Sequence, residues 1–591
     1  MKKVTGDQKF LIFNGAIAFV GLLFRLIAGF QLLEFESRVA NPAKVTDMWT
    51  YLQLSREILS GEIPREFYYQ PFYYSVFLPI VRFFCRDSML PVIFAQSLCG
   101  AVSIYLAGLL AARIAGKKAG LIAAGLLALS QICIIYTPYA LLEIMQSFWL
   151  ILLLYLTFLS WSQNKLWQWL STGVVLSFAI LSRGNAWIFL PAIFLAIWFA
   201  SRKKENRKRF TAMACGVVLL GTILPQLPFI TVNSVERGSL QGPSTAGGNV
   251  LALGNTPEAP PGGLVYPESY QLWMEKEKEI SIVKRIFDWA KEEPLAFLEL
   301  QFRKVYLFWN HLEIPNNISP QESIKKAPLL NAFRFIPTGF IMIAALSGIF
   351  LGLRRMFKGK ERLLIAASFV VLYCLAMAAF YNLARFRVPI VPLMCVLGGC
   401  GVMYFIRKFR SGRKNMFIAV FVPAVSWFIV YPGFDCYREY YEPVIMKTVR
   451  PDGVNVPNRK GGRLIYDHGP RVLGGWMPYS TPAIYKKFKL KEAIEPGTMV
   501  TISAAVVASG EYPVITVNGV GIDLSAIRKG SIEMIHLSVP YPGDGIFRFA
   551  FNENLYPVLD IQRSYGRTYD RKGVPMNEEM VLSLSTTGQQ K

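Results

Sequence analysis

Two acidic and three basic residues lie where a membrane protein does not need a charge, four of them at the ends of apolar runs and one, Asp47, about 14 residues beyond the first run. The acids are Asp47 and Glu143, and the arginines are Arg183, Arg385 and Arg387. A carboxylate can accept the proton of a hydroxyl as a general base, and the forked guanidinium group of arginine can bind two oxygens of one phosphate. Together the five residues predict a site in which a base acts beside a bound phosphate.

Each residue also has an ordinary structural role. Asp47 taken alone would be a solvated loop residue, and Glu143 stands where a carboxylate stabilises the N-terminus of a helix. Arginines at the ends of membrane spans contact lipid headgroups. The functional interpretation therefore depends on the five side chains meeting in one place.

The elements that carry these residues are apolar segments of membrane-spanning length. The chain has 591 residues, of which 53% are hydrophobic and 14% aromatic, and its mean hydropathy is +0.35. This composition is typical of a polytopic α-helical membrane protein. The apolar runs predict about eleven spans, at residues 10–33, 89–112, 119–138, 144–160, 167–182, 186–200, 211–231, 335–352, 363–381, 388–406 and 416–432.

The net charge of +24 is concentrated in short loops between the apolar runs, around residues 113–118, 201–210, 353–362 and 407–415. Such loops mark the cytoplasmic side of a membrane, so the charge is accounted for without nucleic acid as a partner. Lys2 and Lys3 place the N-terminus on the same side. Alternation of the spans then puts the long loops 34–88 and 232–334, and everything after about residue 433, outside the cytoplasm.

The cysteines and histidines show no spacing typical of a metal site. The eight cysteines lie mostly in apolar runs without a C-x-x-C pair, and His311, His468 and His536 are far apart in the chain. The sequence therefore indicates no cofactor, and a divalent ion held by Asp47 and Glu143 is the one metal site left open.

The C-terminal part of the chain differs in character from the rest. Segments such as TMVTISAAVV and YPVITVNGVGIDL alternate apolar and polar residues, and Asn518-Gly519 and Asp544-Gly545 are hairpin signals. We predict a membrane domain over residues 1–432, a linker over 433–460, and an extracytoplasmic β-sandwich of jelly-roll type over 461–591.

Several motifs in chain order resemble those of a known superfamily. Asp47, Tyr51, Gly61, Pro64 and Pro71 form the pattern D-x-x-x-Y…G-x-x-P…P, and LLEIMQSFWLILLL, AILSRGNAWIFLP and ARFRVPIVPLMCVLGG follow it. The series resembles GT-C glycosyltransferases, in particular the bacterial relatives of protein O-mannosyltransferases and of the lipid A aminoarabinose transferase. Met48 and Gln70 depart from the family pattern, which often has Asp-Glu and Pro-Pro at these positions.

The resemblance implies a glycosyltransferase of a bacterial inner membrane that takes a sugar from a polyprenyl-phosphate donor. The acceptor would be a protein, lipid or glycan hydroxyl outside the cytoplasm, and the anomeric centre would be inverted. Asp47 would be the general base, Glu143 would orient the sugar or acceptor, and the arginines would hold the leaving phosphate. Further residues implied to contact the substrate are Tyr51, Tyr69, Tyr73, Asn249 and Asn255.

The same topology fits proteins of different function. A ligase or polymerase would use a pyrophosphate-linked oligosaccharide, and a flippase or scaffold would not catalyse transfer at all. The aromatic residues near Asp47 would then be an interfacial belt. A transporter is expected to have paired inverted repeats and polar residues in the middle of its spans, and the sequence shows neither clearly.

Overall fold

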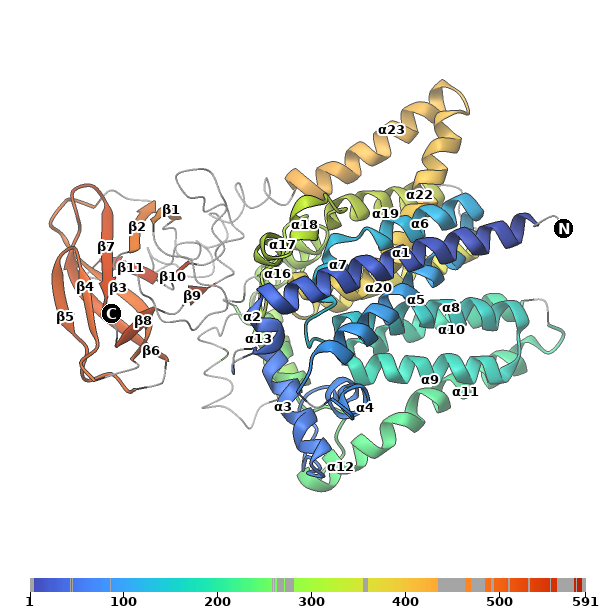
Figure 1. Ribbon diagram of the computed structural model, residues 1–591. Coiled ribbons are helices and arrows are strands. Elements are labelled where there is room, and N and C mark those ends of the chain that lie inside the picture. Colours follow the sequence, from blue (N-terminus) through green and yellow to red (C-terminus); the bar gives the residue numbers. More distant parts are fainter. Residues whose placement is uncertain are drawn as a thin grey trace. The chain divides into compact units, whose positions relative to one another are not determined.

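A computed structural model gives the fold as helices followed by strands (Figure 1). The chain forms two compact units. The first consists of Met1–Leu251, Lys304–His311 and Pro320–Pro432. The second consists of Ala252–Arg303, Leu312–Ser319 and Gly433–Lys591. The structure describes residues 5–586 except 43, 45, 86, 203, 258, 260, 263–269, 271–280, 354–359, 434–462, 469–483, 490–493, 509–510, 530–531, 553, 558, 561–578 and 581.

The first unit is a bundle of helices. Its N-terminal part contains α1 (Gly6–Phe35), α2 (Ser37–Ala40), α3 (Asp47–Leu59), the π-helical turn η1 (Phe72–Phe77), α4 (Leu78–Arg82), α5 (Leu90–Ala115), α6 (Lys117–Ala128), α7 (Gln131–Tyr136), α8 (Glu143–Gln163), α9 (Leu166–Ser182), η2 (Gly184–Phe189), α10 (Leu190–Ser201), α11 (Arg207–Ile223), η3 (Leu224–Gln226) and α12 (Leu227–Arg237).

The remaining helices form the second part of the bundle and the segment of the chain between α12 and α17. Those of the bundle are α17 (Pro320–Lys326), α18 (Pro328–Ala332), α19 (Thr338–Leu353), α20 (Glu361–Ala378), α21 (Ala384–Arg387), η4 (Val388–Ile390), α22 (Val391–Phe409), α23 (Arg413–Phe428) and η5 (Ile429–Gly433). Three more helices, α13 (Gly247–Gly254), α15 (Ile282–Glu292) and α16 (Pro294–Phe308), lie between α12 and α17 in the chain.

The predicted polytopic fold class is confirmed. Among the described residues, eight helical stretches are long and apolar enough to cross a membrane, and α9 and α19 are apolar but shorter. These ten stretches coincide with every predicted span except 119–138. That segment is interrupted, because α6 ends at Ala128 and α7 begins at Gln131.

The break between α6 and α7 is closed by a distant part of the chain. Gln131 N donates to Ile336 O at 3.0 Å, and Ile336 N donates to Leu129 O at 2.9 Å. The buried Arg25 of α1 donates to Leu127 O at 3.2 Å, which places positive charge at the C-terminal end of α6. Unpaired backbone groups in a bilayer cost several kcal/mol each, so these bonds allow the chain to leave the helix inside the bundle.

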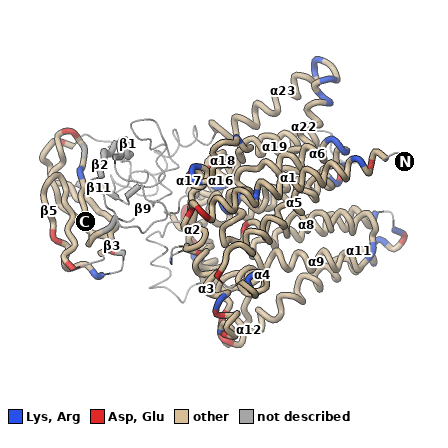
Figure 2. The backbone as a smooth tube through the Cα atoms, viewed as in Figure 1, with Lys and Arg blue, Asp and Glu red and all other residues tan. Residues whose placement is uncertain are grey.

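Lysines and arginines gather at one end of the bundle, where the N-terminus also lies (Figure 2). They come from the ends of α5 and α6, the α10–α11 connection, the start of α20 and the α22–α23 connection. We call this end of the bundle the basic end. The described residues of the basic loops that the sequence assigns to one side of a membrane therefore share one side of the structure.

Glycines allow α19 and α22 to pack with their backbones close together. A Cβ atom on Gly348 would lie 2.2 Å from Leu397 O, and one on Gly401 would lie 2.4 Å from Ala344 O. No real Cβ approaches an atom so closely, and a carbonyl of a neighbouring helix cannot swing aside. Small residues that bring backbones together are the common means of packing helices in membranes.

We expect Gly348→Ala to lower the free energy of unfolding by about 1–3 kcal/mol, because α19 must move away from α22. Gly216→Ala is the matched control, since Gly216 lies within α11 and a Cβ there meets nothing within 4 Å. The control should be neutral or slightly stabilising, because alanine favours a helix. Thermal unfolding of both variants in the same detergent tests this, and equal melting temperatures would contradict the packing argument.

The second unit contains the C-terminal strands. They are β1 (Arg463–His468), β2 (Ile484–Lys489), β3 (Met499–Ala508), β4 (Val514–Val517), β5 (Val520–Asp523), β6 (Ile532–Pro540), β7 (Ile546–Phe551), β8 (Leu555–Pro557), β9 (Leu559–Asp560), β10 (Glu579–Met580) and β11 (Leu582–Thr586). One antiparallel sheet has the order β1-β2-β7-β4-β5, another has the order β11-β3-β6 with β8 also paired to β3, and β9 pairs with β10.

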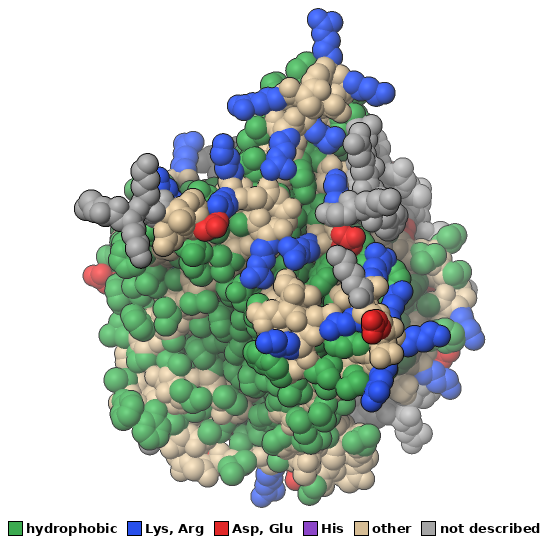
Figure 3. Space-filling model, turned by 90° about the vertical axis from the view of Figure 1, so that its right-hand side faces the viewer, with side chains coloured by type: hydrophobic (Ala, Val, Ile, Leu, Met, Phe, Trp, Pro, Cys, Tyr) green, Lys and Arg blue, Asp and Glu red, His purple; other side chains and the backbone are tan. Residues whose placement is uncertain are grey.

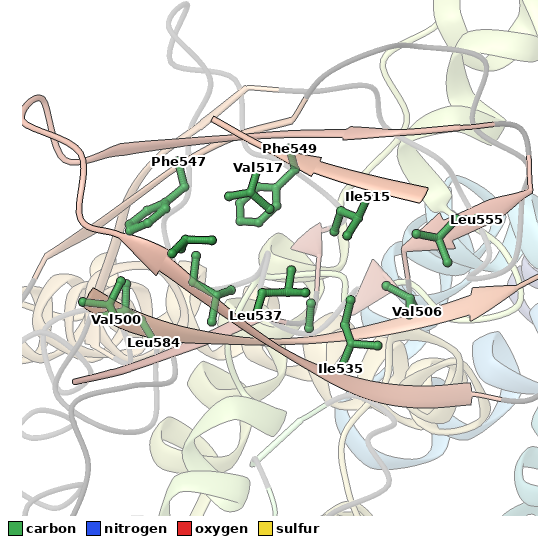
Figure 4. Close-up of a cluster of buried hydrophobic side chains, with 13 residues drawn as sticks. Val500, Val506, Ile515, Val517, Ile535, Leu537, Phe547, Phe549, Leu555 and Leu584 are labelled. Carbon is green, nitrogen blue, oxygen red and sulfur yellow. The ribbon is translucent and has the colours of Figure 1, made fainter. Parts of the chain in front are cut away.

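The two larger sheets share one apolar core, as a sandwich does (Figure 4). Alternate residues of β3, including Val500 and Val506, lie across this core from Phe547 and Phe549 of β7. The Asn518-Gly519 turn joins β4 to β5 with positive φ at both residues, which is the geometry expected of that pair. The predicted β-sandwich is confirmed in character, while the predicted linker 433–460 lies outside the described residues except for Gly433.

Candidate functional site

Two ion pairs lie in the first unit among the residues that the sequence analysis selected. Arg385 Nη1 donates to Asp47 Oδ2 in a close ion pair, and Arg183 Nη2 donates to Glu143 Oε1 at 2.9 Å. The side chain of Glu143 is 1% exposed, whereas that of Asp47 is 29% exposed. Of the two acids, Asp47 is therefore the more accessible to a molecule arriving from outside.

The ends of helices position all four charges. Asp47 is the first residue of α3, whose N-cap Thr46 accepts a hydrogen bond from Trp49 N, and Glu143 is the first residue of α8. Arg183 follows the last residue of α9, and Arg385 lies in the single turn α21. The helix dipole stabilises a carboxylate at a helix N-terminus, so both acids occupy positions that favour a negative charge.

The ring of Phe386 connects the two ion pairs. The guanidinium carbon of Arg183 lies 4.4 Å from the centroid of this ring, and that of Arg385 lies 4.9 Å from it. Because one ring contacts both cations, the two arginines are held as one group. Phe386 is not among the residues predicted from the sequence, although it stands between Arg385 and Arg387 in the motif ARFR.

The charges of both ion pairs act on the hydroxyl group of Tyr51. It is buried one turn after Asp47 on α3. Burial, and after it the charge of Asp47, raises the pKa of Tyr51 well above its usual value, and the charges of Arg385, Glu143 and Arg183 also act on its hydroxyl. The phenol therefore remains protonated and able to donate a hydrogen bond. The structure thus brings together Asp47, Glu143, Arg183 and Arg385, four of the five residues that the functional interpretation requires.

Arg387 lies beside a segment that the sequence analysis did not select. Its Nη1 donates to Asn310 O, and Asn382 Nδ2 donates to Lys304 O at 2.8 Å. The side chain of Lys304 is fully buried, and burial lowers its pKa to about 7. Residues 304–309 end the amphipathic stretch 280–309, whose composition predicts a helix at the membrane surface, so the sequence did not indicate that this segment packs beside Asn382 and Arg387.

Several polar atoms at and near the Glu143–Arg183 pair have no hydrogen-bond partner among the described residues. Within the described residues, Glu143 Oε2, Arg183 Nε and both amide atoms of Gln146 are buried without a hydrogen-bond partner. Gln146 lies one turn after Glu143 on α8. Native proteins satisfy most buried polar atoms, so such a group beside an ion pair is suited to a ligand with several hydroxyls.

Three tyrosines of segment 67–74 pack around Tyr51. The ring of Tyr69 lies edge-on to Tyr51 at 6.0 Å between centroids, and that of Tyr73 lies at 5.5 Å. Tyr73 is completely buried, and its hydroxyl donates to Gln96 Oε1 at 3.1 Å. Tyr69 is only partly buried, so of these two rings it is the one with a face for a ligand.

Hydrogen bonds attach the start of the long loop to the same aromatic segment. Asn233 Oδ1 accepts from Phe67 N at 2.7 Å, and Asn249 Nδ2 donates to the hydroxyl of Tyr68 at 2.7 Å. Asn249 therefore lies beside this segment. Asn255 belongs to the second unit, where its side-chain oxygen accepts from Gln301 at 3.0 Å.

The described residues offer no group of three or more His, Cys, Asp and Glu side chains arranged to hold a metal ion. Asp47 and Glu143 are each paired with an arginine instead. The chemistry that this arrangement supports is proton transfer to Asp47 beside a cluster of guanidinium groups.

A family model confirms the resemblance over part of the chain. The model of the dolichyl-phosphate-mannose-protein mannosyltransferases matches residues 70–229, and the chain thus resembles GT-C glycosyltransferases. The matched part contains Glu143 and Arg183, whereas Asp47, Arg385 and Arg387 lie outside it. No curated protein matches the sequence.

Three solved structures show what the fold is similar to. The oligosaccharyltransferase AglB of Archaeoglobus fulgidus, in complex with an inhibitory peptide and a dolichol-phosphate, has 15% identity and a TM-score of 0.40, with 74% of this chain and 58% of that chain covered. ArnT of Cupriavidus metallidurans bound to undecaprenyl phosphate has 14% identity and a TM-score of 0.38, with coverages of 75% and 73%. The arabinosyltransferase EmbB of Mycobacterium smegmatis has 12% identity and a TM-score of 0.25, with coverages of 97% and 64%.

Proposed function

We propose that this GT-C-like membrane protein moves a sugar from a polyprenyl-phosphate donor to the hydroxyl group of an acceptor. The observation that carries the proposal is the pair of carboxylate–arginine contacts joined through Phe386, with Asp47 as the more exposed acid. The match of residues 70–229 to the mannosyltransferase family supports the same class of reaction.

In the proposed reaction, Asp47 takes the proton of the acceptor hydroxyl as that oxygen attacks the anomeric carbon of the sugar. The bond between the anomeric carbon and the phosphate oxygen breaks, and polyprenyl phosphate leaves with the electron pair. Attack from the side opposite the phosphate inverts the anomeric centre. A direct displacement of this kind needs a base on the acceptor side and positive charge on the leaving phosphate.

The arginines would bind the phosphate of the donor. Arg385 is paired with Asp47 in the structure, so a phosphate that binds Arg385 in its place frees the carboxylate to accept a proton. Arg183 is held beside Arg385 by Phe386, and Arg387 lies two residues further along. Glu143 and Gln146 would accept and donate hydrogen bonds to the sugar hydroxyls through their unpartnered atoms.

The proposed location is a bacterial inner membrane with the basic end of the bundle in the cytoplasm. Arg113, Lys117, Arg202 and Arg407 all lie at this end, as the positive-inside rule expects for cytoplasmic loops. The ends of α3, α8 and α9 that carry the site would then face the opposite side, where the acceptor and the β-sandwich would also lie.

An activity assay of the purified full chain in lipid nanodiscs tests the proposal. The donors are polyprenyl-phosphate sugars or polyprenyl-pyrophosphate sugars, and membrane extracts supply the acceptors. We expect release of polyprenyl phosphate together with a new glycosylated product, both detected by mass spectrometry. Turnover of the pyrophosphate donor alone would favour a ligase or polymerase. Movement of the donor across the bilayer without cleavage would favour a flippase.

We expect Arg387→Gln to raise the KM for the donor about 10-fold or more, since one charge-assisted contact to phosphate is lost. The kcat at saturating donor should fall much less. Arg65→Gln is the control, because Arg65 is exposed after α3 and its substitution removes the same charge. A fall in kcat with an unchanged KM would remove Arg387 from the donor-binding group.

A further inference from the structure

A pocket of about 720 Å³ lies at the basic end of the bundle, away from the site proposed above. The ends of α5, α8 and α10, the start of α20 and one face of α22 line it. Four of the lining side chains are cations, namely Arg113, Arg202, Lys360 and Arg362. Figure 3 shows the basic end from outside, and lysine and arginine far outnumber aspartate and glutamate on it.

Three of the four cations of the pocket are not neutralised from within it. Glu361 is the one carboxylate among the lining residues, and Arg113, Arg202 and Arg362 form no ion pair with any carboxylate that the structure describes. Arg113 and Arg362 lie close enough for their like charges to oppose each other. A cavity lined with one sign of charge concentrates ions of the opposite sign.

Aromatic rings lie beside three of the four cations. The guanidinium carbon of Arg362 lies 6.0 Å from the centroid of Trp161, that of Arg202 lies 4.5 Å from Phe199, and Lys360 Nζ lies 5.6 Å from Tyr404. Arg362 Nη2 also donates to Ser162 Oγ at 3.3 Å. Side chains positioned in this way lose less conformational entropy when an anion arrives.

We propose that this pocket binds a phosphate group, and that the headgroup of an anionic phospholipid supplies it. Basic pockets between the ends of membrane helices are at the depth of lipid headgroups. The pocket is separate from the proposed catalytic site, because α8 runs from Glu143 to the pocket over a length of about 30 Å. The proposal therefore does not depend on the function assigned to the opposite end.

Native mass spectrometry of the full chain in detergent tests the proposal by titration with phosphatidylglycerol, phosphatidylcholine or inorganic phosphate. We expect saturable binding of phosphatidylglycerol in preference to phosphatidylcholine. The double variant Arg113→Gln/Arg362→Gln should bind phosphatidylglycerol about 30-fold more weakly. Each cation near a headgroup contributes about 1 kcal/mol, and about 1.4 kcal/mol corresponds to a tenfold change in the dissociation constant. Lys118→Gln/Arg413→Gln removes two exposed charges from the same end outside the pocket and should leave binding unchanged.

Glu361→Gln provides a test in the opposite direction, since it removes the one acid among the lining residues and should tighten binding of phosphatidylglycerol. This variant keeps the proposal testable if the double arginine variant fails to fold. Displacement of the lipid by millimolar inorganic phosphate would assign the site to the free anion and overturn the lipid as its source. Equal loss in the pocket and control variants, or no change in Glu361→Gln, would overturn the site itself.

Discussion

Asp47→Asn is expected to lower the rate of sugar transfer by about 10²–10⁴-fold, the usual contribution of a general base. Asparagine keeps the size and polarity of the side chain but cannot take up the acceptor proton. The fold should persist, because Asp47 is partly exposed and Arg385 retains its contact with Phe386. Transfer is measured in nanodiscs at saturating donor, with size-exclusion chromatography as the check on folding.

Asp87→Asn is the matched control, since Asp87 is an exposed acid that forms a salt bridge with Arg56 at 3.4 Å. It should retain wild-type activity. The general-base assignment fails if Asp47→Asn is folded and turns over at the wild-type rate, or if both variants lose activity to the same extent.

The second large effect concerns the buried pair of Glu143 and Arg183. Glu143→Gln is expected to lower the free energy of unfolding by about 3–5 kcal/mol, because Glu143 is almost completely buried and solvent cannot replace the carboxylate that Arg183 loses. Arg183→Gln should have a comparable effect, since Glu143 is almost completely buried. Denaturant or thermal unfolding in detergent measures both losses.

The double variant Glu143→Gln/Arg183→Gln separates the structural role of the pair from its functional role. Two amides can hydrogen-bond to each other without a buried charge, so stability should return close to that of the wild type. Sugar transfer should not return, because the guanidinium that we assign to the donor phosphate is gone. Recovery of both stability and transfer would show that the pair only supports the fold.

The sequence predicted the helical bundle well because spans are recognised from apolar length, and length survives whatever a helix packs against. It also selected Glu143 and the arginines, since a charge at the end of a span is unusual without a partner, and it selected Asp47 through the motif of the first outer loop. The sequence could not predict that Asp47 pairs with Arg385, because the two residues are 338 positions apart and each acid could have paired with any of the three arginines. Lys304 was missed for a related reason, since its stretch has the charge pattern of a surface helix.

The sequence also did not predict that the helix is interrupted at Leu129 and Ser130, between α6 and α7. Both residues stand within a continuous apolar run, and hydropathy reports transfer into a bilayer without reporting which backbone groups are paired. The partner Ile336 is remote in the chain, so the hydrogen bonds that allow the break appear only in three dimensions.

The same interruption sets an order of events during synthesis of the protein. The segment that contains α6 and α7 reaches the membrane before the residue that completes it, because Ile336 follows Ser130 by about 200 residues and ribosomes add about 5–20 residues per second. For about 10–40 s the nascent chain must therefore hold this segment with its gap unfilled. The N-terminal third of the bundle is thus not a finished module to which later helices are added, and its maturation ends only when α19 arrives.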